Sequence, residues 1–349
     1  MKEEIPAALA RVKVSKRVAV AVILCGLVGI VPYLARTQER NEVWGALPQL
    51  PLIGVTSSTQ NPLQIGLLHW YNANLTTSFG VGSAPIGIAF DGANIWVANF
   101  NSSAVTKLRA SDGKVLGTFA LSSPVGVAFD GSNVWVTNFL DDTVTKLRAS
   151  DGSLLGTFST GGGPYGLGFD GANIWVANIG SNNVTKLRAS DGTVLGTFSV
   201  GTGPEFVAFD GTSIWVTNTA SDTVTELRDS DGSSLGSFKV GAFPVGVAFD
   251  GTNLWVGNEN SNTVTKLRAT DGKLLGTFVV GQAPRGVVFD GANIWVTNMG
   301  SNNVTKLRAG NGSVLGTFAV GRNPDGIAFD GANIWVANSS SSSKRVTKL

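Results

Sequence analysis

The stretch at residues 164–178, PYGLGFDGANIWVAN, decides the fold of this chain, because it recurs seven times with few changes. The copies are marked by their tryptophans, which are Trp96, Trp135, Trp175, Trp215, Trp255, Trp295 and Trp335. The first interval between them is 39 residues and the other five are each 40. A fixed period of this length indicates a stacked or ring-closed repeat architecture. A residue found in every copy is first a structural residue, so specific function has to be sought where the copies differ.

Each copy contains four short segments with the character of a β-strand. In the copy that begins at Pro164 they cover residues 166–169, 174–177, 184–188 and 194–198. Asp-Gly pairs at 170–171 and 191–192 separate the first two and the last two, which is a hairpin signal. The first two segments are apolar on both faces, whereas the third carries Lys and Arg and is expected nearer the circumference. This change from apolar inner strands to a charged strand further out is typical of a blade of a β-propeller. A solenoid is the alternative, but it would need capping repeats.

The two ends of the repeat region predict a closed ring. The last copy stops after its third strand, and residues 75–82 resemble the fourth strand of the other copies. We therefore expect residues 75–82 to complete the last of seven four-stranded antiparallel blades, within a propeller that covers residues 65–349. Residues 65–71 and 344–349 compete for the third strand of that blade. We expect 344–349 to pair beside 75–81, with 65–71 outside the blade or disordered.

The N-terminal part has a different character. Residues 1–17 are basic and precede an apolar stretch at 18–35, whose uncharged part, VAVAVILCGLVGIVPYL, is near the shortest length that spans a bilayer. The basic flank favours a cytoplasmic N-terminus. We predict a single-pass signal anchor, a linker at 36–64 and an extracytoplasmic propeller. A signal peptide that is cleaved to give a secreted protein, or a buried helix of a soluble protein, are the alternatives.

Charge and composition limit the function classes. The formal net charge of +2 argues against a nucleic-acid partner. The only cysteine, Cys25, and the only histidine, His69, lie outside the seven main copies, so nucleophilic triads and histidine-based metal sites do not fit the repeats. The third strands carry pairs that we interpret as a solvated basic belt: Lys107/Arg109, Lys146/Arg148, Lys186/Arg188, Lys266/Arg268 and Lys306/Arg308.

The units P-x-G-x-A-F-D-G, N-I-W-V-x-N and V-T-K-L resemble the propeller superfamily that includes virginiamycin B lyase-like, NHL and YVTN repeat proteins. The resemblance covers about residues 65–349 and implies the propeller fold. It is a poor guide to activity, because this superfamily contains lyases, lactonases and binding modules. The resemblance to virginiamycin B lyase-like enzymes implies a site in a central pocket, made of His and Glu side chains with a divalent metal ion. No histidine of these repeats matches that site, whereas a carboxylate-only metal site remains open.

Two columns of the repeat vary while their neighbours hardly change. The residue after the recurrent proline runs Ile86, Val125, Tyr165, Glu205, Val245, Arg285 and Asp325, and the residue after the recurrent asparagine runs Phe100, Phe139, Ile179, Thr219, Glu259, Met299 and Ser339. In a propeller both columns are expected on one face. That face then has an apolar sector (Phe100, Phe139, Tyr165, Ile179) and a charged sector (Glu205, Glu259, Arg285, Asp325). The fourth copy departs further, with Phe206 and Glu226. Unconstrained loop tips would vary in the same way.

These features predict a monomeric, membrane-anchored propeller that acts as a non-catalytic binding or scaffold module. The varied face is the expected binding surface for a protein, peptide or glycan, with no cofactor. The alternative is a metal-dependent lyase or lactonase-like enzyme, in which Glu205, Glu259 and Asp325 hold one divalent metal ion in the central funnel.

Overall fold

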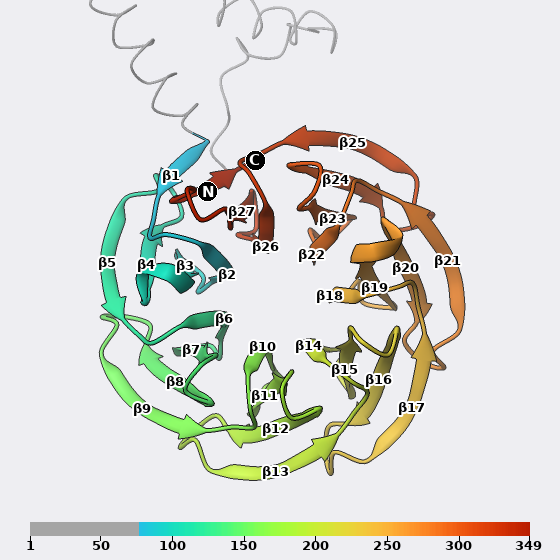
Figure 1. Ribbon diagram of the computed structural model, residues 1–349, viewed down its shortest axis with the longest axis horizontal. Coiled ribbons are helices and arrows are strands. Elements are labelled where there is room, and N and C mark those ends of the chain that lie inside the picture. The colour runs from blue at the N-terminus through green and yellow to red at the C-terminus, as the bar shows by residue number, and fades with distance from the viewer. Residues whose placement is uncertain (1–76) are drawn as a thin grey trace, which may run out of the picture. The chain divides into compact units, whose positions relative to one another are not determined.

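The computed structural model describes residues 77–349, which form seven four-stranded antiparallel sheets arranged as the blades of a ring (Figure 1). The innermost strand of each blade starts at the recurrent proline. These strands are β2 (Pro85–Phe90), β6 (Pro124–Phe129), β10 (Pro164–Phe169), β14 (Pro204–Phe209), β18 (Pro244–Phe249), β22 (Pro284–Phe289) and β26 (Pro324–Phe329). The second strands end at the recurrent asparagine. They are β3 (Asn94–Asn99), β7 (Asn133–Asn138), β11 (Asn173–Asn178), β15 (Ser213–Asn218), β19 (Asn253–Asn258), β23 (Asn293–Asn298) and β27 (Ile334–Asn338).

The third and fourth strands complete each blade toward the circumference. The third strands are β4 (Ala104–Arg109), β8 (Thr143–Arg148), β12 (Asn183–Arg188), β16 (Thr223–Arg228), β20 (Thr263–Arg268), β24 (Asn303–Arg308) and β28 (Arg345–Lys348). The outer strands are β5 (Val115–Ala120), β9 (Leu154–Ser159), β13 (Val194–Ser199), β17 (Ser234–Lys239), β21 (Leu274–Val279), β25 (Val314–Ala319) and β1 (Ser78–Gly80). Two 3-10 helices, η2 (Phe100–Ser102) and η3 (Glu259–Ser261), follow β3 and β19. The seven-bladed fold predicted from the sequence is confirmed.

Blades 1 to 6 are each formed by four consecutive strands, from β2–β5 to β22–β25, whereas blade 7 combines β26, β27 and β28 with β1. In blade 7, Phe79 of β1 lies opposite Val346 of β28, and the backbone N–H of Lys348 donates to the carbonyl of Thr77. The expected pairing of 344–349 beside 75–81 is therefore confirmed for the described part of it, in which residues 345–347 pair with 78–80. The competing segment 65–71, the linker and the predicted anchor lie outside the described residues. Between residues 77 and 349 no helix is long and apolar enough to cross a membrane.

The hydrophobic core lies between neighbouring blades. Trp96 and Val105 of blade 1, for example, pack against Val134 and Val136 of blade 2. The Trp96 indole N–H donates to Asp91 over 2.7 Å, and an equivalent Asp–Trp hydrogen bond recurs in all seven blades. The Asp-Gly turn therefore does more than reverse the chain, because its carboxylate also fixes the buried indole.

The lysines of the third strands differ from the expected solvated belt. Lys107 is buried, its Nζ lies 5.1 Å from the centre of the Trp96 ring, and it donates to the carbonyl of Ala149 in blade 2 over 2.6 Å. The same lysine–carbonyl contact to the following blade is made by Lys146, Lys186, Lys266 and Lys348. The arginines of the same strands lie at the surface, where Arg109 pairs with Asp112, for example. The basic-belt interpretation was therefore wrong for Lys107, Lys146, Lys186 and Lys266, each of which ties its blade to the next. Lys306 is half-buried and instead lies 3.9 Å from Asp290 of its own blade.

Candidate functional site

The two variable columns lie at the same end of every blade. In blade 1, Pro85 of β2 lies opposite Asn99 of β3, and the same pairing holds in the other six blades. The loop before each first strand and the loop after each second strand are therefore neighbours, as the sequence analysis expects. We call this end of the ring the loop face.

The backbone of the loop face is held by hydrogen bonds between blades. Asp142, after the second strand of blade 2, accepts from the N–H of Gly163 before the first strand of blade 3 over 2.8 Å. Four equivalent bonds join the following pairs of blades. Their backbone N–H donors are Gly203, Phe243, Ala283 and Asn323, and the side-chain acceptors are, in the same order, Asn182, Asp222, Asn262 and Asn302. The variable side chains are therefore carried by a fixed framework rather than by unconstrained loop tips, which is what a preorganised site requires.

The charged sector forms one cluster around Arg285. Its Nη2 donates to Glu205 Oε1 over 2.9 Å, and its Nε lies 3.6 Å from both Glu259 Oε2 and Asp325 Oδ1. The side chains of Glu205 and Asp325 are only 3% and 5% exposed, and those of Arg285 and Glu259 are each 17% exposed. We call these four residues the charged cluster. The structure brings together all four residues of the predicted charged sector, although they come from four different blades.

Burial governs the protonation of the charged cluster. It raises the pKa of Glu205 to about 7, against the opposing charge of Arg285. Burial likewise raises the pKa of Asp325, again opposed by Arg285. The carboxylates, Asp325 foremost, raise the pKa of Arg285 itself, so the guanidinium stays charged.

The apolar sector is a run of aromatic rings in edge-to-face contact. Phe100 contacts Phe139 at 6.4 Å between ring centres, Phe139 contacts Tyr165 at 6.2 Å, and Tyr165 contacts Phe206 at 5.8 Å. Ile179 is half-buried beside this run and donates its backbone N–H to Gly163. The structure thus joins the three predicted aromatic residues and extends them by one ring, Phe206.

Phe206 was not among the predicted face residues, although a signal for it exists. It occupies the third position of a first strand, where the other six blades carry glycine. At Gly126 a Cβ atom would lie 2.2 Å from the carbonyl oxygen of Tyr165 in the next blade, so glycine permits the close approach of neighbouring first strands. Blade 4 alone places a large side chain at this level. A departure from a steric requirement is a stronger indication of a site than a departure at a loop tip.

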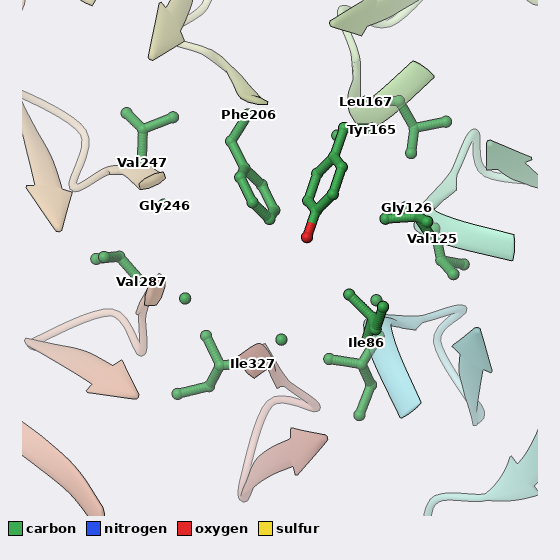
Figure 2. A pocket seen from close by; sticks show the side chains of 16 residues that line it. Ile86, Val125, Gly126, Tyr165, Leu167, Phe206, Gly246, Val247, Val287 and Ile327 are labelled. Atoms are coloured by element: carbon green, nitrogen blue, oxygen red, sulfur yellow. The ribbon is translucent and has the colours of Figure 1, made fainter. Parts of the chain in front are cut away.

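A cavity of about 150 Å³ occupies the central channel of the ring. Its lining is mainly aliphatic, contributed by the first strands of all seven blades, and it includes Tyr165 and Phe206. Figure 2 shows the Tyr165 hydroxyl pointing toward the middle of the channel, with the Phe206 ring beside it. Burial, and then the charges of Asp325 and Glu205, raise the pKa of Tyr165, so the phenol stays neutral and the charged cluster lies within its electrostatic reach.

The donor set does not fit a divalent metal ion. Glu205, Glu259 and Asp325 do converge, but the guanidinium of Arg285 lies between them. A metal ion held by all three carboxylates would displace Arg285 and break its bond to Glu205. Over residues 77–349, no three His, Cys, Asp or Glu side chains are grouped so that they could hold a metal.

No family model matches this chain, and no curated protein matches it. Solved structures do match. A streptogramin B lyase is 20% identical, with a TM-score of 0.67 over 78% of this chain and 95% of that one. A catalytically inactive virginiamycin B lyase from Staphylococcus aureus with quinupristin is 20% identical, with a TM-score of 0.66 over 76% and 94%. The fold is that of a virginiamycin B lyase-like propeller. Hydrazine synthase from Kuenenia stuttgartiensis is 19% identical at a TM-score of 0.68 over 76% and 95%, so proteins of different activity have the same fold.

Proposed function

We propose that this protein is a membrane-anchored, extracytoplasmic propeller that binds a peptide, glycan or partner protein through its loop face without catalysing a reaction. The observation that carries the proposal is the juxtaposition of the charged cluster with the run of aromatic rings on a hydrogen-bonded backbone. Aromatic anchors beside buried charges are the groups that dominate binding energy at protein interfaces. The apolar stretch at 18–35 supports the membrane anchor.

The binding role is tested by presenting the full-length chain, in detergent, to arrays of peptides and glycans. For the ligands found, Phe139→Ala should weaken binding at least tenfold, because it removes one of the two middle rings of the aromatic run. The matched control is Leu154→Ala, which removes an apolar side chain that is 64% exposed on outer strand β9. Melting curves of both variants check that the fold is retained. No ligand in either array, or equal losses in both variants, would refute the proposal.

A metal-dependent lyase or lactonase-like enzyme is the second candidate. It is favoured by the structural similarity to streptogramin B lyase and by the convergence of three carboxylates near the channel. The position of Arg285 argues against it, because a guanidinium that already neutralises these carboxylates competes with a metal ion. A response of the protein to divalent metals distinguishes the two candidates.

A further inference from the structure

The charged cluster contains more negative than positive groups. Three carboxylates surround a single guanidinium, so the fully ionised cluster carries two uncompensated negative charges. Buried charges are normally paired, because removing them from water is costly. The raised pKa values of Glu205 and Asp325 reduce this imbalance at low pH. Where the carboxyl groups are ionised, the cluster favours a ligand that brings positive charge.

Two carboxylate oxygens of the charged cluster lack a hydrogen-bond donor. Glu259 Oε2 and Asp325 Oδ1 are buried and have no hydrogen-bond partner, and neither does Arg285 Nε. The Nε atom lies 3.6 Å from both oxygens, which is too long for a hydrogen bond. Even after a small shift its single proton could satisfy only one of the two acceptors. Asp325 is only 4% exposed, so bulk water does not readily solvate its carboxylate. When all three carboxyl groups are ionised, at least one acceptor therefore needs a donor from outside the charged cluster.

The surroundings indicate what kind of donor fits. Tyr165 lines the channel, where its hydroxyl points toward the middle (Figure 2). It also belongs to the column that supplies Glu205, Arg285 and Asp325, and the charges of these residues act on its phenol. Tyr165 therefore links the apolar cavity to the charged cluster. The Phe206 ring lies beside it, 5.8 Å from the Tyr165 ring. Carboxylates next to aromatic rings are the combination that binds organic cations.

We propose that the charged cluster and the channel bind a ligand that carries a protonated amine on a small apolar group. The ammonium donates to Asp325 and Glu259, and the apolar group enters the channel beside Tyr165 and Phe206. This inference rests on the proposed function, and it names the ligand chemistry of the same face. A free amine and a lysine side chain or amino terminus of a peptide share this chemistry.

Calorimetry of the full-length chain at pH 8 tests the proposal with three matched probes. Phenethylammonium should bind saturably, 2-phenylethanol at least tenfold more weakly, and phenylacetate more weakly still. Asp325→Asn and Glu259→Gln should each weaken phenethylammonium about tenfold, the loss expected when a charged acceptor is removed. Asp112→Asn, the same change at an exposed turn, should leave binding unchanged. The use of two variants guards against one that fails to fold, which melting curves identify.

A second arm of the experiment separates the sources of the amine. A peptide with a free lysine and a blocked amino terminus is compared with its N-acetyllysine counterpart. Binding that acetylation abolishes supports a peptide source, whereas binding of phenethylammonium alone supports a free amine.

The outcomes separate the inference from the function on which it rests. The inference is overturned if phenylacetate binds as tightly as phenethylammonium, if phenethylammonium does not bind, or if neither carboxylate variant weakens binding. If array ligands still depend on Phe139 in any of those cases, the binding function stands without the amine. If neither the arrays nor phenethylammonium give binding, both proposals fail.

Discussion

Glu226 stands where the other six blades carry lysine, and it removes a contact between blades. Its carboxylate accepts from Ser213 in its own blade over 2.8 Å, whereas Lys107 and its counterparts in four other blades donate to a carbonyl of the next blade. Glu226→Lys should restore the lysine–carbonyl contact, with Ala269 of blade 5 as acceptor, and place an ammonium over Trp215. We expect the free energy of unfolding to rise by about 1–2 kcal/mol.

Urea denaturation measures this gain, and Lys107→Glu serves as the reverse control in blade 1. The control should lose stability by at least a similar amount, because it also leaves the carbonyl of Ala149 without its donor. A neutral or destabilising Glu226→Lys would show that the lysine–carbonyl contacts do not hold the blades together.

Glu205 makes the stability of the protein depend on pH in an unusual direction. Its pKa is about 7 in the folded chain and 4.5 as an ordinary glutamate, so the unfolded chain loses the proton first as pH rises. The folded state is therefore penalised progressively between pH 4.5 and 7, by up to about 3 kcal/mol above that window. Glu205→Gln removes this penalty. The stability of the variant relative to wild type should increase from pH 4.5 to 7.5.

Unfolding free energies of both proteins across this pH range provide the test. The difference between the two proteins isolates Glu205 from other titrating groups. A relative stability that falls as pH rises would mean that Arg285 stabilises the Glu205 carboxylate more than burial penalises it.

At the scale of strands, the outer strands contribute unequally to the contacts between blades. The Phe278 ring of β21 packs on Trp255 and against Gly312 of blade 6, where a Cβ atom would lie 2.1 Å from the ring. Phe318 of β25 packs on Trp295 in the same way, but it is 39% exposed. Over residues 77–349 no turn of blade 7 covers it as Gly312 covers Phe278.

Phe278→Ala should therefore cost about 3 kcal/mol of unfolding free energy, and Phe318→Ala only about 1 kcal/mol. Each variant is the control of the other, because the residue type and the position in the blade are the same. Denaturant titration measures both losses. Equal losses would mean that packing against the following blade adds little to the contact with the tryptophan.

The strands themselves could be predicted from the sequence, because Asp-Gly turns and apolar periodicity are local signals. The predicted strand at residues 166–169, for instance, is β10 with two residues added at its start. The burial of the lysines could not be predicted, because a buried lysine and a solvated lysine look the same in the sequence of a polar strand. The acceptor is also distant in the sequence: for Lys107 it is Ala149, 42 residues further along. Only the packing of adjacent blades brings the two together.

Part of the candidate site could also be predicted from the sequence. The two variable columns gave the residues of the loop face, since the repeat itself shows which positions are free to change. The pairing within the charged cluster was not accessible, because Arg285 reaches across blade 5 to a residue 80 positions earlier, Glu205. That contact depends on side-chain length and on the curvature of the ring.

At the scale of the whole molecule, the predicted anchor lies in the apolar stretch at 18–35. When the full-length chain is expressed in a bacterium, we expect it to stay in the membrane pellet after alkaline extraction, because a transmembrane helix is held by its apolar surface. Deletion of residues 1–35 should release the propeller. Extraction of the full-length chain by alkali would contradict the anchor.

The ring as a whole has one end at which its seven near-identical blades differ, and the charged cluster lies there. Our central claim is that Arg285, rather than a metal ion, holds the three carboxylates of the charged cluster together. The most direct measurement is the melting temperature of the full-length chain, titrated with Ca²⁺, Mg²⁺, Mn²⁺ and Zn²⁺ and then with EDTA. Because a ligand of the folded state raises the melting temperature, our account predicts no shift with any of these ions. A saturable rise that is lost in Glu205→Ala or Glu259→Ala would contradict it.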